Sequence, residues 1–298
     1  MEKPQVKKQI KYIGTNIKLY FSLYFAVLGF MGVVITIVGS FLNLSELFGD
    51  MPVWARILIV LGVFVLLAIL ILPFFFLKKR AIYYKNGEHE VTAEYGDIER
   101  ISSKKGDKKM VVISVNTGFD MIVENPGENA LVSENTNHGR FIKRVCKEEN
   151  ISYEQLNKKV QELLAQKDGT SSTIVNKRKG NPIDYKVGTY VIYELGKIYY
   201  LLFALSRFDE KNNAHPGKES KDHLPLEELL NAINDSSQNL DVYVPLMGTS
   251  NSRYQLSFNE SFNEMKHFFL SHRKQVESKI HIVVNSRVRD EVSIFKNN

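Results

Sequence analysis

The segment Asp241 to Arg253 contains the residues best suited to hold an anion. An apolar stretch, Asp241 to Leu246, runs into a loop of small and polar residues ahead of a predicted helix. Open α/β sheets bind ligands at the carboxyl ends of their strands, and the N–H groups that begin a helix favour anions. The residues that would surround a diphosphate are Gly248, Thr249, Ser250, Asn251, Ser252 and Arg253. The alternative is a loop that only caps the helix.

The signatures of the common enzyme classes are missing from the sequence. It contains no Gly-x-x-x-x-Gly-Lys-Ser/Thr, no Gly-x-Gly-x-x-Gly, no His-Glu-x-x-His and no Gly-x-Ser-x-Gly. The single cysteine, Cys146, excludes an intramolecular disulfide and a cysteine-based zinc cluster, and it fits a reducing compartment. We therefore expect no catalytic residue, no metal and no cofactor.

Two long runs near the N-terminus, Leu19 to Leu42 and Ile57 to Leu77, contain no charged residue and no histidine. Runs of this length predict two transmembrane helices, at about 19–42 and 57–77, in a membrane anchor that spans residues 1–80. Lysines flank both runs on their outer sides, and the loop between them has only Arg56, so both termini should be cytoplasmic. The sequence thus predicts a two-pass protein of the bacterial inner membrane, with membrane lipid as a partner.

The remaining residues, 81–298, are enough for one cytoplasmic domain. Strand and helix alternate through its second half, which predicts an α/β sheet covered on both faces. The net charge of +6 gathers largely beside the apolar runs, so we expect no nucleic-acid partner. Strands are expected at 93–98, 110–116, 119–123, 130–133, 190–194, 198–206, 241–246, 280–284 and 292–295. Helices are expected from His138, around Leu156 to Leu164, around Leu226 to Ile233, and from Tyr254 to Phe269.

Three segments in this order resemble the macro domain, a module that binds ADP-ribose. Gly96-Asp97-Ile98 is similar to the motif whose acidic residue accepts a hydrogen bond from the adenine amino group, a role that would fall on Asp97. Val111 to Asn116 resembles the following strand, so that Asn116 would face the distal ribose. Val244 to Arg253 is similar to the second phosphate loop. The resemblance implies a three-layer α/β/α domain with a mixed central sheet.

Within that family the sequence is most similar to the membrane-tethered macro proteins of type II Thoeris anti-phage defence. Ser133 to Ile142 resembles their first ligand loop, which would place His138 and Gly139 beside the phosphates. Asn116 is followed by Thr-Gly-Phe where other macro domains have Asn-Ala-Ala-Asn, which weakens the case for ADP-ribosyl hydrolysis.

The resemblance implies a ligand-sensing effector rather than an enzyme. Its signal would be an ADP-ribose derivative, in particular histidine-linked ADP-ribose from a TIR-domain enzyme. Binding would drive homo-oligomerisation and inner-membrane disruption, which kills the infected cell by abortive infection. Two alternatives stand beside this one: a membrane-anchored ADP-ribosyl hydrolase, and a structural anchor for a protein partner.

Overall fold

The computed structural model describes residues 10–41, 51–77, 79–104, 106–124, 131–167, 172–174, 179–209, 214–216, 223–237, 239–249 and 254–295. The chain divides into two compact units, Met1–Lys79 with Phe295–Asn298, and Arg80–Ile294. The first unit contains the helices α2 (Ile17–Phe41) and α4 (Val53–Leu77). The Tyr20 hydroxyl of α2 donates a hydrogen bond to the Ala68 carbonyl of α4 at 3.0 Å, which holds the two helices side by side.

Among the described residues, no helix combines the length and the apolar character needed to cross a membrane. This finding overturns the predicted transmembrane helices at 19–42 and 57–77 and the predicted two-pass location in the inner membrane with cytoplasmic termini. The prediction relied on the length of the two runs and on their lack of charged residues. The run in α2 includes Ser22 and Tyr20, and the Tyr20 hydroxyl makes a hydrogen bond within this unit.

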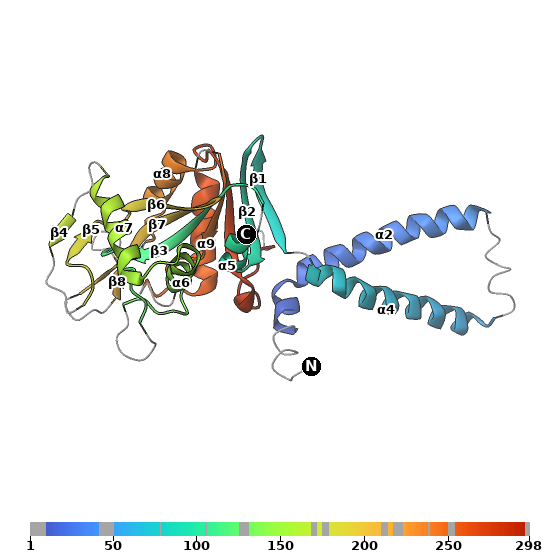
Figure 1. Cartoon of the computed structure of the whole chain (residues 1–298). Helices are drawn as coiled ribbons and strands as arrows, with labels where there is room; N and C mark the ends of the chain where they lie inside the picture. The colour runs from blue at the N-terminus through green and yellow to red at the C-terminus, as the bar shows by residue number, and fades with distance from the viewer. Residues whose placement is uncertain are drawn as a thin grey trace. The chain divides into compact units, whose positions relative to one another are not determined.

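The second unit is built on a mixed sheet of eight strands (Figure 1). The order is β1-β2-β10-β9-β3-β7-β6, and β8 pairs with β7. Five neighbouring strands, from β2 to β7 in this order, are parallel, whereas β1, β6 and β8 are antiparallel to their neighbours. The strands are β1 (Arg80–Asn86), β2 (His89–Gly96), β3 (Lys109–Asn116), β6 (Tyr190–Leu195), β7 (Ile198–Phe208), β8 (Ala214–Pro216), β9 (Asp241–Pro245) and β10 (Lys279–Asn285). A separate ladder joins β4 (Ser172–Ile174) to β5 (Ile183–Tyr185).

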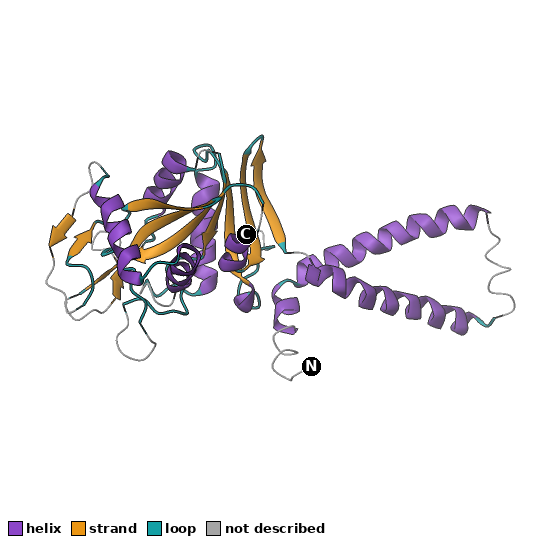
Figure 2. Cartoon of the chain, viewed as in Figure 1, coloured by secondary structure: helices purple, strands orange, loops and turns teal. Residues whose placement is uncertain are grey.

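Helices cover both faces of the large sheet (Figure 2). On one face, α6 (Asn137–Glu149) and α7 (Tyr153–Ala165) pack their apolar sides on β3, β6 and β7 in a single buried core. On the other face lie α8 (Leu226–Ser236) and α9 (Phe258–Ser271), and α9 contacts β10. Two short elements, α5 (Ile98–Ser103) and the 3₁₀ turn η2 (Ser286–Val288), follow β2 and β10. This arrangement confirms the predicted α/β domain with a mixed sheet.

Most predicted elements of this unit are confirmed, and four differ from the structure. The last helix begins at Phe258 rather than near Tyr254, because Gln255 has a φ of +58° and Ser257 is the cap. No strand forms over Val292–Phe295, where the Val292 carbonyl and the Ile294 N–H both pair with the Tyr95 hydroxyl instead. Of the short strands expected at 119–123 and 130–133, the described residues show one isolated bridge, between Glu124 and Ser133.

Candidate functional site

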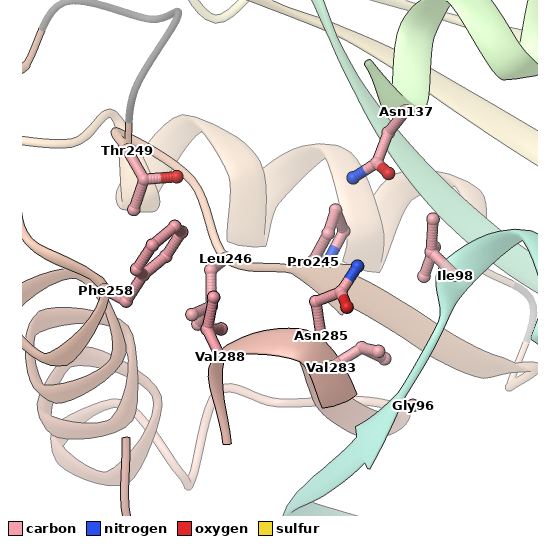
Figure 3. A pocket seen from close by; sticks show the side chains of 10 residues that line it. All are labelled: Gly96, Ile98, Asn137, Pro245, Leu246, Thr249, Phe258, Val283, Asn285 and Val288. Carbon is pink, nitrogen blue, oxygen red and sulfur yellow. The ribbon is translucent and has the colours of Figure 1, made fainter. Parts of the chain in front are cut away.

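A cavity of about 150 Å³ lies at the carboxyl ends of β2, β9 and β10 (Figure 3). The parallel direction of these strands brings their ends to one edge of the sheet, where open α/β sheets bind ligands. The residues that line the cavity are Gly96, Ile98, Asn137, Pro245, Leu246, Thr249, Phe258, Val283, Asn285 and Val288.

The lining of this cavity is neutral. Its polar side chains are the carboxamides of Asn137 and Asn285 and the hydroxyl of Thr249, and Phe258 adds an aromatic ring. Figure 3 shows the two carboxamides extending into the cavity from opposite sides. None of the described lining residues is charged. Such a mixture suits an uncharged ring with polar edges, such as a nucleobase, better than it suits a phosphate.

The positive end of a helix lies directly beside the cavity. Asn137 is the first residue of α6, which has 13 residues. The Thr136 hydroxyl caps the helix by accepting a hydrogen bond from the Gly139 N–H at 3.0 Å. Residue 139 must be glycine, because a Cβ there would lie 2.2 Å from the Ser133 carbonyl oxygen. The N-terminus of a helix of this length attracts anions.

His138 was predicted to contact phosphate, yet it does not line the cavity. It is buried, and its Nε2 has no hydrogen-bond partner among the described residues. Burial lowers its pKa from 6.5 to about 3, so the imidazole is neutral at physiological pH. It therefore supplies no positive charge for a phosphate.

Asp97 stands next to the cavity, between the lining residues Gly96 and Ile98. It is the N-cap of α5, and its Oδ1 accepts a hydrogen bond from the Glu99 N–H at 3.0 Å. Its Oδ2 lies 3.6 Å from Nη1 of Arg140. These contacts engage the carboxylate at the start of α5, and Asp97 itself is not a lining residue of the cavity.

Asn116 lies at the end of β3 and does not line the cavity. Its Oδ1 accepts hydrogen bonds from the N–H groups of Gly118 at 3.0 Å and Asp120 at 3.3 Å. The side chain therefore shapes the turn that follows β3, in which Phe119 has a positive φ of 49°.

The predicted phosphate loop is described only at its beginning. Thr249 lines the cavity. Gly248 has a φ of +78°, and a Cβ there would lie 2.7 Å from a methyl group of Leu224. Ser250, Asn251, Ser252 and Arg253 lie outside the described residues.

Several lining residues were not predicted as site residues. Asn137, Asn285 and Val288 are far apart in the sequence, and only the parallel sheet and the start of α6 bring them to one cavity. The sequence could have indicated Asn285, because it is a polar residue that directly follows the apolar residues of β10. Asn137 likewise follows Thr136 at a helix start.

Comparison with known proteins identifies the family. Residues 91–285 match the family model described as "Thoeris protein ThsA, Macro domain". No curated protein is significantly similar in sequence. Among solved structures, a mutant of the Oceanobacillus iheyensis macrodomain has 11% identity and a TM-score of 0.42, over 72% of this chain and 93% of that one. The same macrodomain with MES bound has 12% identity and a TM-score of 0.41, over 72% and 94%.

A Bacteroides thetaiotaomicron protein of unknown function has 11% identity and a TM-score of 0.35, over 67% of this chain and 99% of that one. TM-scores this low do not by themselves establish a shared fold, so the assignment depends on the family match. Because that match spans more than half of the sequence, the chain belongs to the macro-domain family of the Thoeris protein ThsA, which places it in Thoeris anti-phage defence.

Proposed function

We propose that this protein is an effector of type II Thoeris defence whose macro domain senses an ADP-ribose-derived signal, in particular histidine-linked ADP-ribose from a TIR-domain enzyme. One observation carries the proposal. A neutral cavity with two carboxamides lies directly beside the N-terminus of α6, which gives adjacent places for a base and for phosphates.

The two parts of this site differ in chemistry as the two parts of ADP-ribose do. The cavity offers Phe258, Ile98 and two carboxamides for a flat ring with polar edges. The start of α6 offers N–H groups to the diphosphate. Thr249 lies on the opposite side of the cavity from Asn137, the first residue of α6. A volume of about 150 Å³ is below the roughly 300 to 1,000 Å³ of a complete small-molecule pocket, so the cavity accounts for one end of the ligand.

In the proposed mechanism the ligand changes the relative stability of two assembly states. It can act only through a difference in affinity for the two states, so the bound state must be the one that forms the homo-oligomer. Membrane disruption is not included in this proposal, because no helix among the described residues is long and apolar enough to cross a membrane.

We further propose that the domain retains its ligand rather than hydrolysing it. His138, the histidine nearest to the α6 start, is buried and neutral, and the Asn116 side-chain oxygen is engaged by two backbone N–H groups. Both observations support a binding role, since neither side chain is placed to activate water. An ADP-ribosyl hydrolase would need other residues for that step.

Calorimetric titration tests the proposal and separates it from hydrolysis. The full-length protein should bind ADP-ribose and histidine-linked ADP-ribose with a stoichiometry near one, and chromatography should recover the ligand unchanged. Light scattering should show larger assemblies when the signal is bound. Release of free ADP-ribose from the conjugate would favour the hydrolase, and failure to bind any derivative would favour a structural role.

A further inference from the structure

The chain passes between its two units at two peptide bonds, which we call the unit junctions. They are Lys79–Arg80 and Ile294–Phe295. Tyr83 lies three residues after the first junction, and its hydroxyl donates a hydrogen bond to the carbonyl of Ile294 at the second junction. One contact within the second unit therefore ties the two junctions together.

Tyr83 makes this contact from an irregular position in β1. The register between β1 and β2 shifts between Ile82 and Tyr84, so Tyr83 is the extra residue of a β-bulge. A bulge turns a side chain away from the regular alternation of its strand. Burial raises the pKa of the Tyr83 hydroxyl, so the hydroxyl stays protonated and can donate its hydrogen bond at any physiological pH.

Val288 connects the ligand cavity to the segment that follows η2. Its side chain lines the cavity, and its carbonyl accepts hydrogen bonds from the N–H groups of Glu291 at 2.9 Å and Val292 at 3.3 Å. The Asn285 side chain also lines the cavity (Figure 3), and its Oδ1 accepts a hydrogen bond from the Arg287 N–H at 3.0 Å. The residues that a ligand would touch are thus hydrogen-bonded to the segment beyond them.

This segment is packed too tightly to absorb a displacement of η2. Val292 and Ile294 are both 0% exposed, and the Tyr95 hydroxyl pairs with the carbonyl of Val292 and the N–H of Ile294. Residues 286–294 contain neither glycine nor proline. Packed elements change between discrete arrangements rather than deform gradually, so a shift at one end of such a segment reaches the other end.

We propose that residues 286–294 are a coupling segment, which carries the effect of a bound ligand from the cavity to the unit junctions and so to the helices α2 and α4. This inference rests on the proposed function and specifies how its ligand acts on assembly. Contact of the ligand with Val288 and Asn285 stabilises one arrangement of the coupling segment. The Tyr83 hydroxyl holds the end of that segment to β1, so both junctions follow the change.

Hydrogen exchange on the full-length protein tests this inference. Saturating histidine-linked ADP-ribose should change the exchange rates of backbone amides in α2 and α4 of wild type by roughly fivefold or more, the lower end of ordinary allosteric coupling. Tyr83→Phe should still bind the ligand in calorimetry, but the change in α2 and α4 should fall to about twofold or less. Tyr95→Phe, which breaks the path at Val292, should have the same effect.

Tyr193→Phe is the matched control. The Tyr193 side chain is buried, and its hydroxyl donates to the Glu149 carboxylate at 2.9 Å, at the end of α6. The variant loses a buried tyrosine hydroxyl of the same unit, while the hydrogen bond that it breaks lies outside the coupling segment. The ligand should therefore change exchange in α2 and α4 as it does in wild type. Thermal unfolding checks that each variant is folded.

Four outcomes would overturn the inference. If wild type binds the ligand and exchange in α2 and α4 does not change, the coupling segment transmits nothing, whereas ligand binding by the macro domain stands. If Tyr83→Phe and Tyr95→Phe keep the full response, the helices respond by another route. If Tyr193→Phe loses as much of the response as Tyr83→Phe, general loosening of the domain explains the loss. If wild type does not bind the ligand, the proposed function fails and the inference fails with it.

Discussion

The Glu260 carboxylate accepts a hydrogen bond from the Ser257 N–H at 2.8 Å, while the Ser257 hydroxyl accepts one from the Glu260 N–H at 3.2 Å. This reciprocal pair closes the first turn of α9 and lowers the pKa of Glu260, mainly through the Ser257 hydroxyl. A negative charge thus already occupies the helix start that sequence reasoning favoured for a diphosphate. The start of α6, which has no acidic residue in its first turn, is the better anion site.

Loss of a helix cap should have different consequences at the two helix starts. Ser257→Ala and Thr136→Ala should each lower the free energy of unfolding by about 1 kcal/mol, because each removes an N-cap hydrogen bond. Both caps precede a residue that lines the cavity, but only Thr136→Ala should also weaken ADP-ribose binding, because the first turn of α9 already holds the Glu260 carboxylate and the first turn of α6 holds no acidic residue. Urea unfolding and calorimetry measure the two effects. If Ser257→Ala bound ADP-ribose more weakly than Thr136→Ala did, the result would contradict this prediction and would indicate that the phosphates bind at the start of α9.

Replacement of Gly139 should be costly although alanine favours helices. A Cβ at this position would lie 2.2 Å from the Ser133 carbonyl oxygen and 2.8 Å from the Glu134 Cα, and backbone atoms cannot rotate away. Gly139→Ala should lower the free energy of unfolding by about 1–3 kcal/mol or more.

Gly196→Ala is the control for that change. This glycine has a φ of +60°, and a Cβ added there would meet no atom of the described residues within 4 Å, so only backbone strain of about 1–2 kcal/mol is expected. A loss in Gly139→Ala no larger than in Gly196→Ala would show that the loop at 133–136 yields easily.

His138 should make stability depend on pH. Its folded pKa of about 3 is below the ordinary 6.5, so above pH 6.5 it is neutral in both states and has no effect. Between pH 6.5 and about 3 the unfolded chain binds a proton that the folded protein does not, so stability falls as pH falls. Wild type should lose about 1.4 kcal/mol more per pH unit than His138→Asn in this window. Urea unfolding across the window measures it, and equal slopes would show that the ring is accessible to protons.

The helices and strands that could be predicted from the sequence are those in which the pattern of apolar residues marks the buried face. The apolar run of β3 and the amphipathic spacing of α6 and α7 each mark a surface that must be covered. The predictions failed in segments whose secondary structure depends on the local backbone conformation or on contacts with residues distant in the sequence. The helical spacing of apolar residues runs from Tyr254 to Phe258 and Phe262, but the positive φ of Gln255 prevents a helix before Phe258. Val292 to Phe295 reads as a strand, yet its backbone groups pair with the Tyr95 hydroxyl.

The site was harder to predict than the fold. Thr249 lines the cavity, as do the two neighbours of Asp97, and local motifs mark both segments in the sequence. Asn137 and Asn285 were missed because their meeting depends on the strand order β2-β10-β9, which joins segments distant in the sequence. Asn116 and His138 have polar side chains that suit a ligand, but their burial and contacts inside the domain could not be read from residue type.

The Tyr95 hydroxyl should hold the segment after η2 in place. It donates to the Val292 carbonyl at 2.7 Å and accepts from the Ile294 N–H at 3.2 Å. Tyr95→Phe leaves both buried groups without this partner, which should cost about 1–3 kcal/mol. Hydrogen exchange at the Ile294 amide should become faster in Tyr95→Phe, while that at the Val112 amide in β3 changes little. Unchanged exchange at Ile294 would show that packing alone fixes the segment.

The most direct test of a ligand in the cavity is to fill the cavity. Val288 lines it from η2, so Val288→Phe should occupy the space of a base, whereas Val288→Ala should leave that space open. Calorimetric titration with ADP-ribose should show binding to wild type and to Val288→Ala, and at least tenfold weaker binding to a folded Val288→Phe. Equal binding by Val288→Phe and wild type, or no binding by wild type to any ADP-ribose derivative, would contradict the account.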